Sequence, residues 1–216
     1  EDAGMISVTQ VLEEFPNKQL VEWMLRDPKK AKQVGDEAKR IGSATDWFIQ
    51  QEFKPVLPLD QATPLTPIEQ EAVKNCLQAW QTFKQQRPDL IAAVTGIQTE
   101  LTDGEIVGHP DLIVQTPERF GIIDVKTSKA IQPTHWVQVA AYLSLHAPLP
   151  VMTSVFLGVL RLDKQTGQPE YRELFDPLEL ARLAEVWRAY RTLAQHQEQH
   201  RELMRGMREQ EALDVS

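Results

Sequence analysis

The sequence predicts an α/β fold in which helices flank a mixed sheet, in the central order helix, three strands, helix, strand. Three observations predict it. Apolar residues repeat at helical spacing after residue 66. Three apolar runs separated by turn residues follow between residues 91 and 126. A second helical pattern, over 133–146, then leads into the nearly all-apolar run 151–162, which is typical of a strand buried on both faces.

The bulk composition suits a single domain of 216 residues. We expect a helical N-terminal region over 1–65, the core over 66–175 and a long C-terminal helix over 176–216. No apolar run approaches the ~18 residues of a membrane-spanning helix, so no membrane partner is expected. The single cysteine, Cys76, excludes a disulfide framework and a cysteine-ligated cluster, and it fits a reducing, cytoplasmic setting.

The net charge of −8 argues against a protein that coats nucleic acid through bulk electrostatics. It leaves open a protein that grips a phosphate chain locally, through metal ions and a few placed lysines. The acidic residues are spread along the chain and single out no region.

Helix-start signals divide the N-terminal region. Ser7 or Thr9 would cap a first short helix. The pair Asp27-Pro28 starts a long helix, since Asp is a favoured N-cap and Pro a favoured first residue. The three prolines of residues 54–65 predict a linker. The apolar stripe of the long helix is expected to contain Val34, Ala38, Ile41, Ala44 and Phe48.

The core elements follow in order. Thr66 and Glu69 form a capping box that starts a helix with Val73, Cys76, Leu77, Trp80 and Phe83 on its buried face. The pair Asp103-Gly104 predicts a tight turn between the first two strands. Strands are expected at residues 91–102, from the turn to about 115, at 119–126 and at 151–162, with a short edge strand near residue 171. A helix is expected at 133–146, between the third and fourth strands.

The C-terminal helix is expected to begin at Asp176-Pro177. Beyond Gln195 the chain is polar and either extends this helix into solvent or frays. The buried face of the helix is predicted to hold Leu183, Val186, Trp187, Tyr190 and Leu193.

Three charged residues lie within apolar runs that should be buried strands: Asp111, Asp124 and Lys126. A buried charge is costly unless it is paired or holds a metal ion. Asp124 and Lys126 are two residues apart on one strand and therefore point to the same face. If the two strands pair as a hairpin, Asp111 and Asp124 converge, and two close carboxylates repel unless a divalent cation lies between them.

A hard cation such as Mg²⁺ or Mn²⁺ suits carboxylate, carbonyl and water ligands, and the main-chain carbonyl of Val125 would be a further ligand. Lys126 beside a metal-bound water would orient it or offset charge on a phosphate. The group therefore predicts metal-assisted hydrolysis of a phosphodiester. Gln138 and Tyr142 share one face of the following helix, from which they would reach over this site toward substrate.

Three motifs between residues 108 and 142 resemble, in order and spacing, the RecB-like branch of the PD-(D/E)XK nuclease superfamily. GHPDLIV resembles its G-x-x-D-L strand, IDVKTSK its D-x-K strand and QVAAY its Q-x-x-x-Y helix. SVTQVL and the Leu-Val-x-Trp segment after it resemble the N-terminal region of phage-type exonucleases. The resemblance implies a restriction-endonuclease-like core (αβββαβ), catalysis by Asp111, Asp124 and Lys126, and a bacterial or phage-infected cell.

The resemblance also implies two further metal ligands. Asp46 ends the small-residue segment in which many relatives carry His. Relatives often carry Glu on the strand before G-x-x-D, and Glu100 is the candidate here. Counting back across the turn places Gln98 and Glu100 on the face of Asp111, although Glu100 lies nearer the turn than relatives have it.

We therefore expect a Mg²⁺- or Mn²⁺-dependent deoxyribonuclease, most simply a DNA-end exonuclease of phage or recombination and repair type. A structure-specific or restriction-like endonuclease and a non-catalytic DNA-binding module are the alternatives. Partners of such an enzyme would be DNA, further copies of the chain and a single-strand annealing protein.

Overall fold

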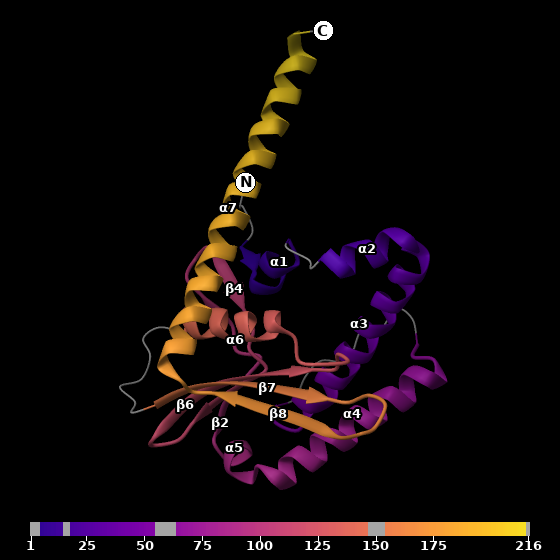
Figure 1. Cartoon of the computed structure of the whole chain (residues 1–216), viewed down its shortest axis with the longest axis vertical. Helices are drawn as coiled ribbons and strands as arrows, with labels where there is room; N and C mark the ends of the chain where they lie inside the picture. Colours follow the sequence, from indigo (N-terminus) through magenta and orange to yellow (C-terminus); the bar gives the residue numbers. More distant parts are fainter. Residues whose placement is uncertain (1–4, 15–17, 55–63, 147–153, 215–216) are drawn as a thin grey trace.

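The computed structural model describes residues 5–14, 18–54, 64–146 and 154–214 (Figure 1). Its helices are α1 (Val8–Glu13), α2 (Lys18–Arg26), α3 (Pro28–Gln51), α4 (Pro67–Gln86), α5 (Pro88–Ala92), α6 (Pro133–Leu145) and α7 (Pro177–Asp214). Its strands are β1 (Ile6–Ser7), β2 (Val94–Ile97), β3 (Leu101–Thr102), β4 (Ile106–Gly108), β5 (Leu112–Gln115), β6 (Arg119–Lys126), β7 (Ser154–Leu162) and β8 (Pro169–Leu174). No helix among the described residues is long and apolar enough to cross a membrane.

The main sheet has five strands in the order β2-β5-β6-β7-β8. Only β6 and β7 run parallel, and the other neighbours are antiparallel, so the sheet is mixed as predicted. A smaller sheet of order β1-β4-β3 stands beside it. The α/β fold class with a mixed sheet and flanking helices is therefore confirmed.

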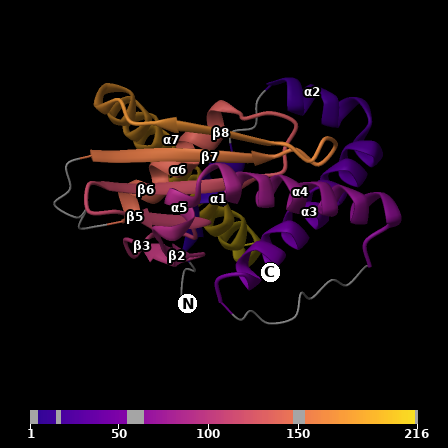
Figure 2. The same cartoon turned by 90° about the horizontal axis from the view of Figure 1, so that it is seen from below.

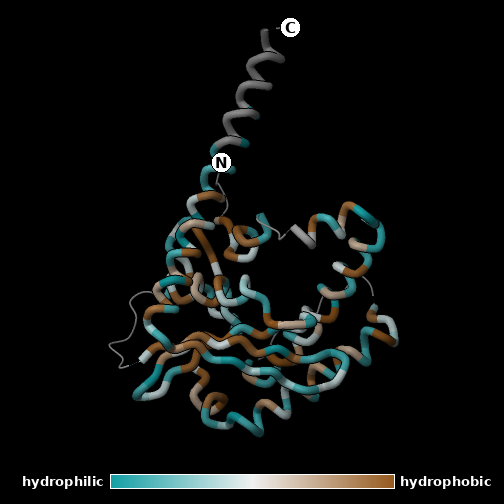
Figure 3. Tube along the Cα trace, in the orientation of Figure 1, coloured by the Kyte–Doolittle hydropathy of each residue, from teal (hydrophilic) through white to brown (hydrophobic). Residues whose placement is uncertain are grey.

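The main sheet lies between two groups of helices, with α6 and α7 on one side and α4 on the other (Figures 1 and 2). Alternate residues of a strand pack against the helices on opposite sides of the sheet, because successive side chains point to opposite faces. Ile122 packs in the core under α6 and α7, and its neighbour Ile123 packs in the core under α3 and α4. β5, β6 and β7 are correspondingly hydrophobic over most of their length, whereas the edge strand β8 is largely polar (Figure 3).

The helix starts follow the predicted signals. Ser7 caps α1 and Thr66 caps α4, each with a complete capping box, and Asp27 caps α3. α7 continues to Asp214, and its last turns extend away from the sheet (Figure 1). Most of the predicted linker 54–65 lies outside the described residues.

The predicted strand over 91–102 is wrong in its bounds. Pro88 starts the short helix α5, which ends at Ala92, and two separate strands follow it. Gln98 lies between them with a φ of 44°, a left-handed conformation that breaks the alternation of a strand. The next predicted strand likewise divides into β4 and β5.

Several residues that were predicted to lie on the buried faces of helices are exposed. Val34, Ala38 and Phe48 of α3 are exposed, as are Val186 and Leu193 of α7. The first half of α3 buries only Ala31, because that part of the helix stands beyond the sheet. Trp187 and the α4 residues Val73, Cys76, Trp80 and Phe83 are buried as predicted.

Candidate active site

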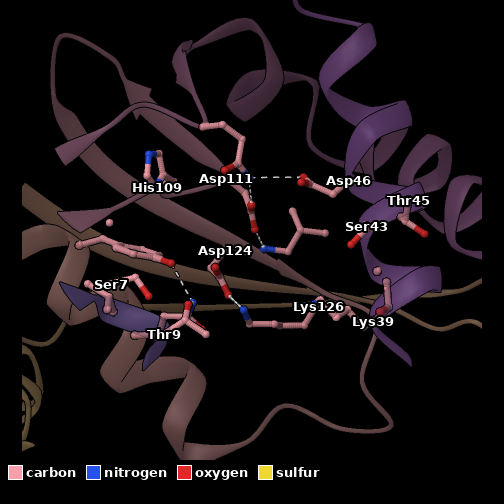
Figure 4. A pocket seen from close by; sticks show the side chains of 18 of the residues that line it. Ser7, Thr9, Lys39, Ser43, Thr45, Asp46, His109, Asp111, Asp124 and Lys126 are labelled. Atoms are coloured by element: carbon pink, nitrogen blue, oxygen red, sulfur yellow. Dashed lines mark hydrogen bonds and ion pairs between the residues drawn. The ribbon is translucent and has the colours of Figure 1, made fainter. Parts of the chain in front are cut away.

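An open cavity of about 580 Å³ lies where α3, α6, the small sheet and the ends of β5 and β6 meet. Residues far apart in the sequence line it, and many of them are polar (Figure 4). The lining includes Ser7, Thr9, Lys39, Gly42, Asp46, Gln98, Gly108, Asp111, Asp124, Val125, Lys126, Gln138 and Tyr142.

Asp111 and Asp124 face each other because of the register of the β5–β6 pair. Leu112 pairs with Ile123, so the next position outward places Asp111 opposite Asp124. The main-chain N–H of Val125 donates a hydrogen bond of 2.5 Å to Oδ2 of Asp111. Burial raises the pKa of Asp111 well above its ordinary value, and the charges of Asp124 and Asp46 add to the rise.

Asp124 and Lys126 form an ion pair on the same face of β6. Lys126 Nζ lies 2.6 Å from Asp124 Oδ2, and Asp124 is only 2% exposed. No other described residue donates a hydrogen bond to that oxygen, so the lysine is its partner there. Burial lowers the pKa of Lys126, but the charges of Asp124 and Asp111 outweigh it, so the pKa is raised and the ammonium keeps its proton.

Asp46 reaches the cavity from α3 and is joined to Asp111 through Gln98. The Gln98 amide donates hydrogen bonds to one oxygen of Asp111 and to Oδ1 of Asp46, the latter at 3.4 Å. Gln50 donates to Oδ2 of Asp46 at 2.8 Å. Burial raises the pKa of Asp46, and these hydrogen bonds offset part of the rise.

Gln138 and Tyr142 line the opposite wall. Gln138 Nε2 donates to the Tyr142 hydroxyl at 2.8 Å and to Thr9 Oγ1 at 3.4 Å. Tyr142 is only 4% exposed, and its ring fills the space above Gly108, where an added Cβ would come within 2.7 Å of it. A glycine is therefore required at position 108 by the packing of Tyr142.

Glu100 is the one predicted site residue that the structure does not bring to the cavity. Its side chain is 63% exposed, and its carboxylate lies 3.6 Å from Nε2 of His109. The reason is the left-handed conformation at Gln98, which turns the following residues away from the face of Asp111. Gln98 takes the inward position instead.

The cavity is also lined by three polar residues that are not among the site residues predicted from the sequence: Gln98, Thr9 and Lys39. Counting back along the strand places both Gln98 and Glu100 on the face of Asp111. Only the expectation of an acidic metal ligand favoured Glu100 over Gln98. Thr9 and Lys39 carry no signal of their own in the sequence, because their place in the cavity depends on how α1 and α3 pack.

The chemistry of the donor set fits a divalent cation. Three aspartates, Asp46, Asp111 and Asp124, share the cavity with the ammonium groups of Lys126 and Lys39, so the ionised groups leave a charge of about −1. Oδ2 of Asp124 has the Lys126 ammonium as its only partner in the described residues and would serve as a ligand atom. In the described part of the chain no three His, Cys, Asp or Glu side chains form a metal-binding group by themselves, so carbonyl and water ligands would complete the set.

The family comparison agrees with this geometry. The model of the PD-(D/E)XK nuclease superfamily matches residues 10–214. The chain belongs to that superfamily. PD-(D/E)XK nucleases generally use divalent metal ions, and their substrate class is nucleic acid. No curated protein matches this PD-(D/E)XK chain.

Solved structures show a similar arrangement at low identity. An alkaline exonuclease from Laribacter hongkongensis, LHK-Exo, is 10% identical over 98% of this chain and 95% of its own, with a TM-score of 0.46. A phage-related exonuclease from Haemophilus somnus is 10% identical over 90% of this chain and 96% of its own, with a TM-score of 0.36. Similarities this remote add nothing to the family assignment.

Proposed function

We propose that this chain is a deoxyribonuclease that hydrolyses phosphodiester bonds with Mg²⁺ or Mn²⁺ and acts on DNA ends as an exonuclease. One observation carries the proposal. The β5–β6 register sets Asp111 against Asp124, with Lys126 on the same face, at the wall of an open cavity. The resemblance of the N-terminal region to phage-type exonucleases favours action at DNA ends over internal cutting.

Asp111 and Asp124 are the proposed metal ligands, with Asp46 and the main-chain carbonyl of Val125 as further ligands. Glu100 is left out because its carboxylate lies outside the cavity. A bound divalent cation would lower the pKa of a water molecule and withdraw charge from a phosphate oxygen.

Lys126 is the proposed catalytic cation. Its ammonium keeps its proton beside Asp124, so it can donate a hydrogen bond to the attacking water or to a phosphate oxygen as negative charge develops there. Gln98 and the Val125 N–H hold Asp111 in place through both carboxylate oxygens. Gln138 and Tyr142 are proposed to contact substrate from the opposite wall, since both line the cavity and one hydrogen bond fixes their relative position.

The test compares linear duplex DNA with closed-circular DNA, each incubated with Mg²⁺, Mn²⁺ or EDTA. We expect metal-dependent loss of the linear substrate only. Lys126→Ala should lower the rate by at least about 100-fold, the effect of removing one group that stabilises transition-state charge. Lys74→Ala, at an exposed lysine of α4 outside the cavity, is the matched control and should retain the rate.

Circular dichroism of Lys126→Ala should show that the fold is kept. Cutting of the closed circle would replace the exonuclease with an endonuclease. No metal-dependent loss of either DNA would refute the enzyme and favour a binding module.

A further inference from the structure

One face of α3 forms a straight stripe that leads into the cavity. Its residues are Lys32, Gly35, Lys39, Gly42 and Asp46, spaced alternately three and four apart. Residues at this spacing lie in line along a helix, because each turn takes about 3.6 residues. The stripe ends at the proposed metal ligand Asp46, and Lys39 and Gly42 also line the cavity (Figure 4).

The N-terminal part of the stripe is open to solvent. Lys32, Gly35 and Lys39 are all exposed, and a Cβ added at Gly35 would meet nothing within 4 Å. At Gly42 the nearest atom to such a Cβ is the Thr127 hydroxyl oxygen, at 3.6 Å. Gly35, between the two lysines, and Gly42, between Lys39 and Asp46, therefore leave a shallow path along which another chain can approach the helix backbone closely.

Lys32 and Lys39 form no ion pair with any residue that the structure describes. By contrast Arg40, on another face of the same helix, is held by the buried carboxylate of Glu69. Asp36 lies one turn after Lys32, yet no ion pair joins them in the described residues. In a chain of net charge −8, two uncommitted ammonium groups in line with the site mark a surface for an anionic chain.

The spacing suits a nucleic acid strand. Lys32 and Lys39 are seven residues apart, which is about 10 Å along a helix at about 1.5 Å per residue. One DNA strand presents a phosphate about every 3.4 Å of duplex axis and also winds around that axis, so the two lysines are far enough apart to contact two different phosphates of one strand.

We propose that the α3 track, defined as Lys32, Gly35, Lys39 and Gly42, carries the sugar-phosphate backbone of the DNA strand that leads to the cleavage site. The lysines neutralise phosphates, and the glycines let the strand lie against the helix. This inference rests on the proposed function, because it takes DNA as the substrate. It adds where outside the metal site that DNA is held.

The test measures binding of a fluorescent duplex of about 20 base pairs to the full chain in EDTA, over a series of salt concentrations. The double variant Lys32→Ala/Lys39→Ala should bind at least about 10-fold more weakly. Its plot of log affinity against log salt should be shallower by about 2, one for each lost phosphate contact. In Mn²⁺ its KM should rise while kcat changes little.

The matched control is Lys30→Ala/Lys74→Ala, which removes the same charge from the opposite face of α3 and from an exposed position of α4 outside the cavity. Its affinity and salt slope should equal those of the wild type. Gly35→Glu is a second probe, because it places a negative charge on the track at an exposed helical position where Gly is itself unfavourable. It should weaken DNA binding without lowering the melting temperature.

Equal losses in the track and control variants would overturn the track, since net charge alone would then explain them. Unchanged binding in Lys32→Ala/Lys39→Ala and in Gly35→Glu would also overturn it, even if the wild type degrades DNA. A wild type that neither binds nor cleaves DNA would refute the proposed function itself, and the track with it.

Discussion

Two clusters of opposite charge in this molecule differ in their balance. The carboxylate site contains Asp46, Asp111 and Asp124 with one ion-paired cation, Lys126. The second cluster, the Arg87–Glu173 network, lies at the far end of the sheet and joins Arg87, Asp89, Arg119 and Glu173. In the network two guanidinium groups match two carboxylates, whereas at the site only one of the three carboxylates, Asp124, is ion-paired in the described residues.

The pKa values follow this balance. Hydrogen bonds from Arg87 lower the pKa of Asp89. Burial raises the pKa of Glu173, but hydrogen bonds from Arg119, Tyr171 and Arg87 outweigh it, so the pKa is lowered. At the site burial raises the pKa values of Asp46 and Asp111. The network is therefore balanced in charge, whereas the site keeps an excess of negative charge when its carboxylates are ionised.

The largest stability effect is expected in the network. Glu173→Gln should lower the free energy of unfolding by about 2 kcal/mol at pH 7, because Glu173 accepts hydrogen bonds from two charged arginines and is only 17% exposed. The lowered pKa means that this contribution is present above pH 4.5, the ordinary value, and is lost as pH falls through the folded-state value. Urea unfolding at pH 7 and pH 3.5 measures both, and an unchanged deficit at low pH would contradict it.

A smaller effect of opposite sign is expected at the site. Asp46→Asn should raise the free energy of unfolding in EDTA by about 1 kcal/mol at pH 8, because burial and the charge of Asp124 disfavour the ionised carboxylate of Asp46. The raised pKa means that ionised Asp46 costs stability above its ordinary value of 3.8, so the gain should shrink as pH falls toward 4. A variant less stable than the wild type at pH 8 would show that the site is already balanced without metal.

The placement of Asp111, Asp124 and Lys126 could be predicted from the sequence, because it depends on the regular geometry of strands and hairpins. The two-residue period of a strand places Asp124 and Lys126 on one face, and an antiparallel hairpin sets Asp111 opposite Asp124. The capping residues of α1, α3 and α4 were predictable for the same reason, since each depends on a few neighbouring residues.

Features that depend on backbone irregularity or on packing were not predictable in this way. The choice between Gln98 and Glu100 depends on a single left-handed residue, and face counting assumes that no such residue intervenes. Helical spacing identified an apolar stripe on α3, but spacing cannot show that half of the helix stands beyond the sheet and leaves Val34 exposed. The same placement makes Lys39 part of the cavity and opens the α3 track.

The most direct test of the central claim is thermal unfolding of the wild type and Asp124→Asn, each in EDTA and in saturating Mn²⁺. If Asp111 and Asp124 hold the cation, Mn²⁺ should raise the melting temperature of the wild type by about 5 °C or more. Asp124→Asn should show no rise, and Glu173→Gln, which loses a carboxylate elsewhere, should show the full rise. An equal rise in Asp124→Asn, or none in the wild type, would contradict the account.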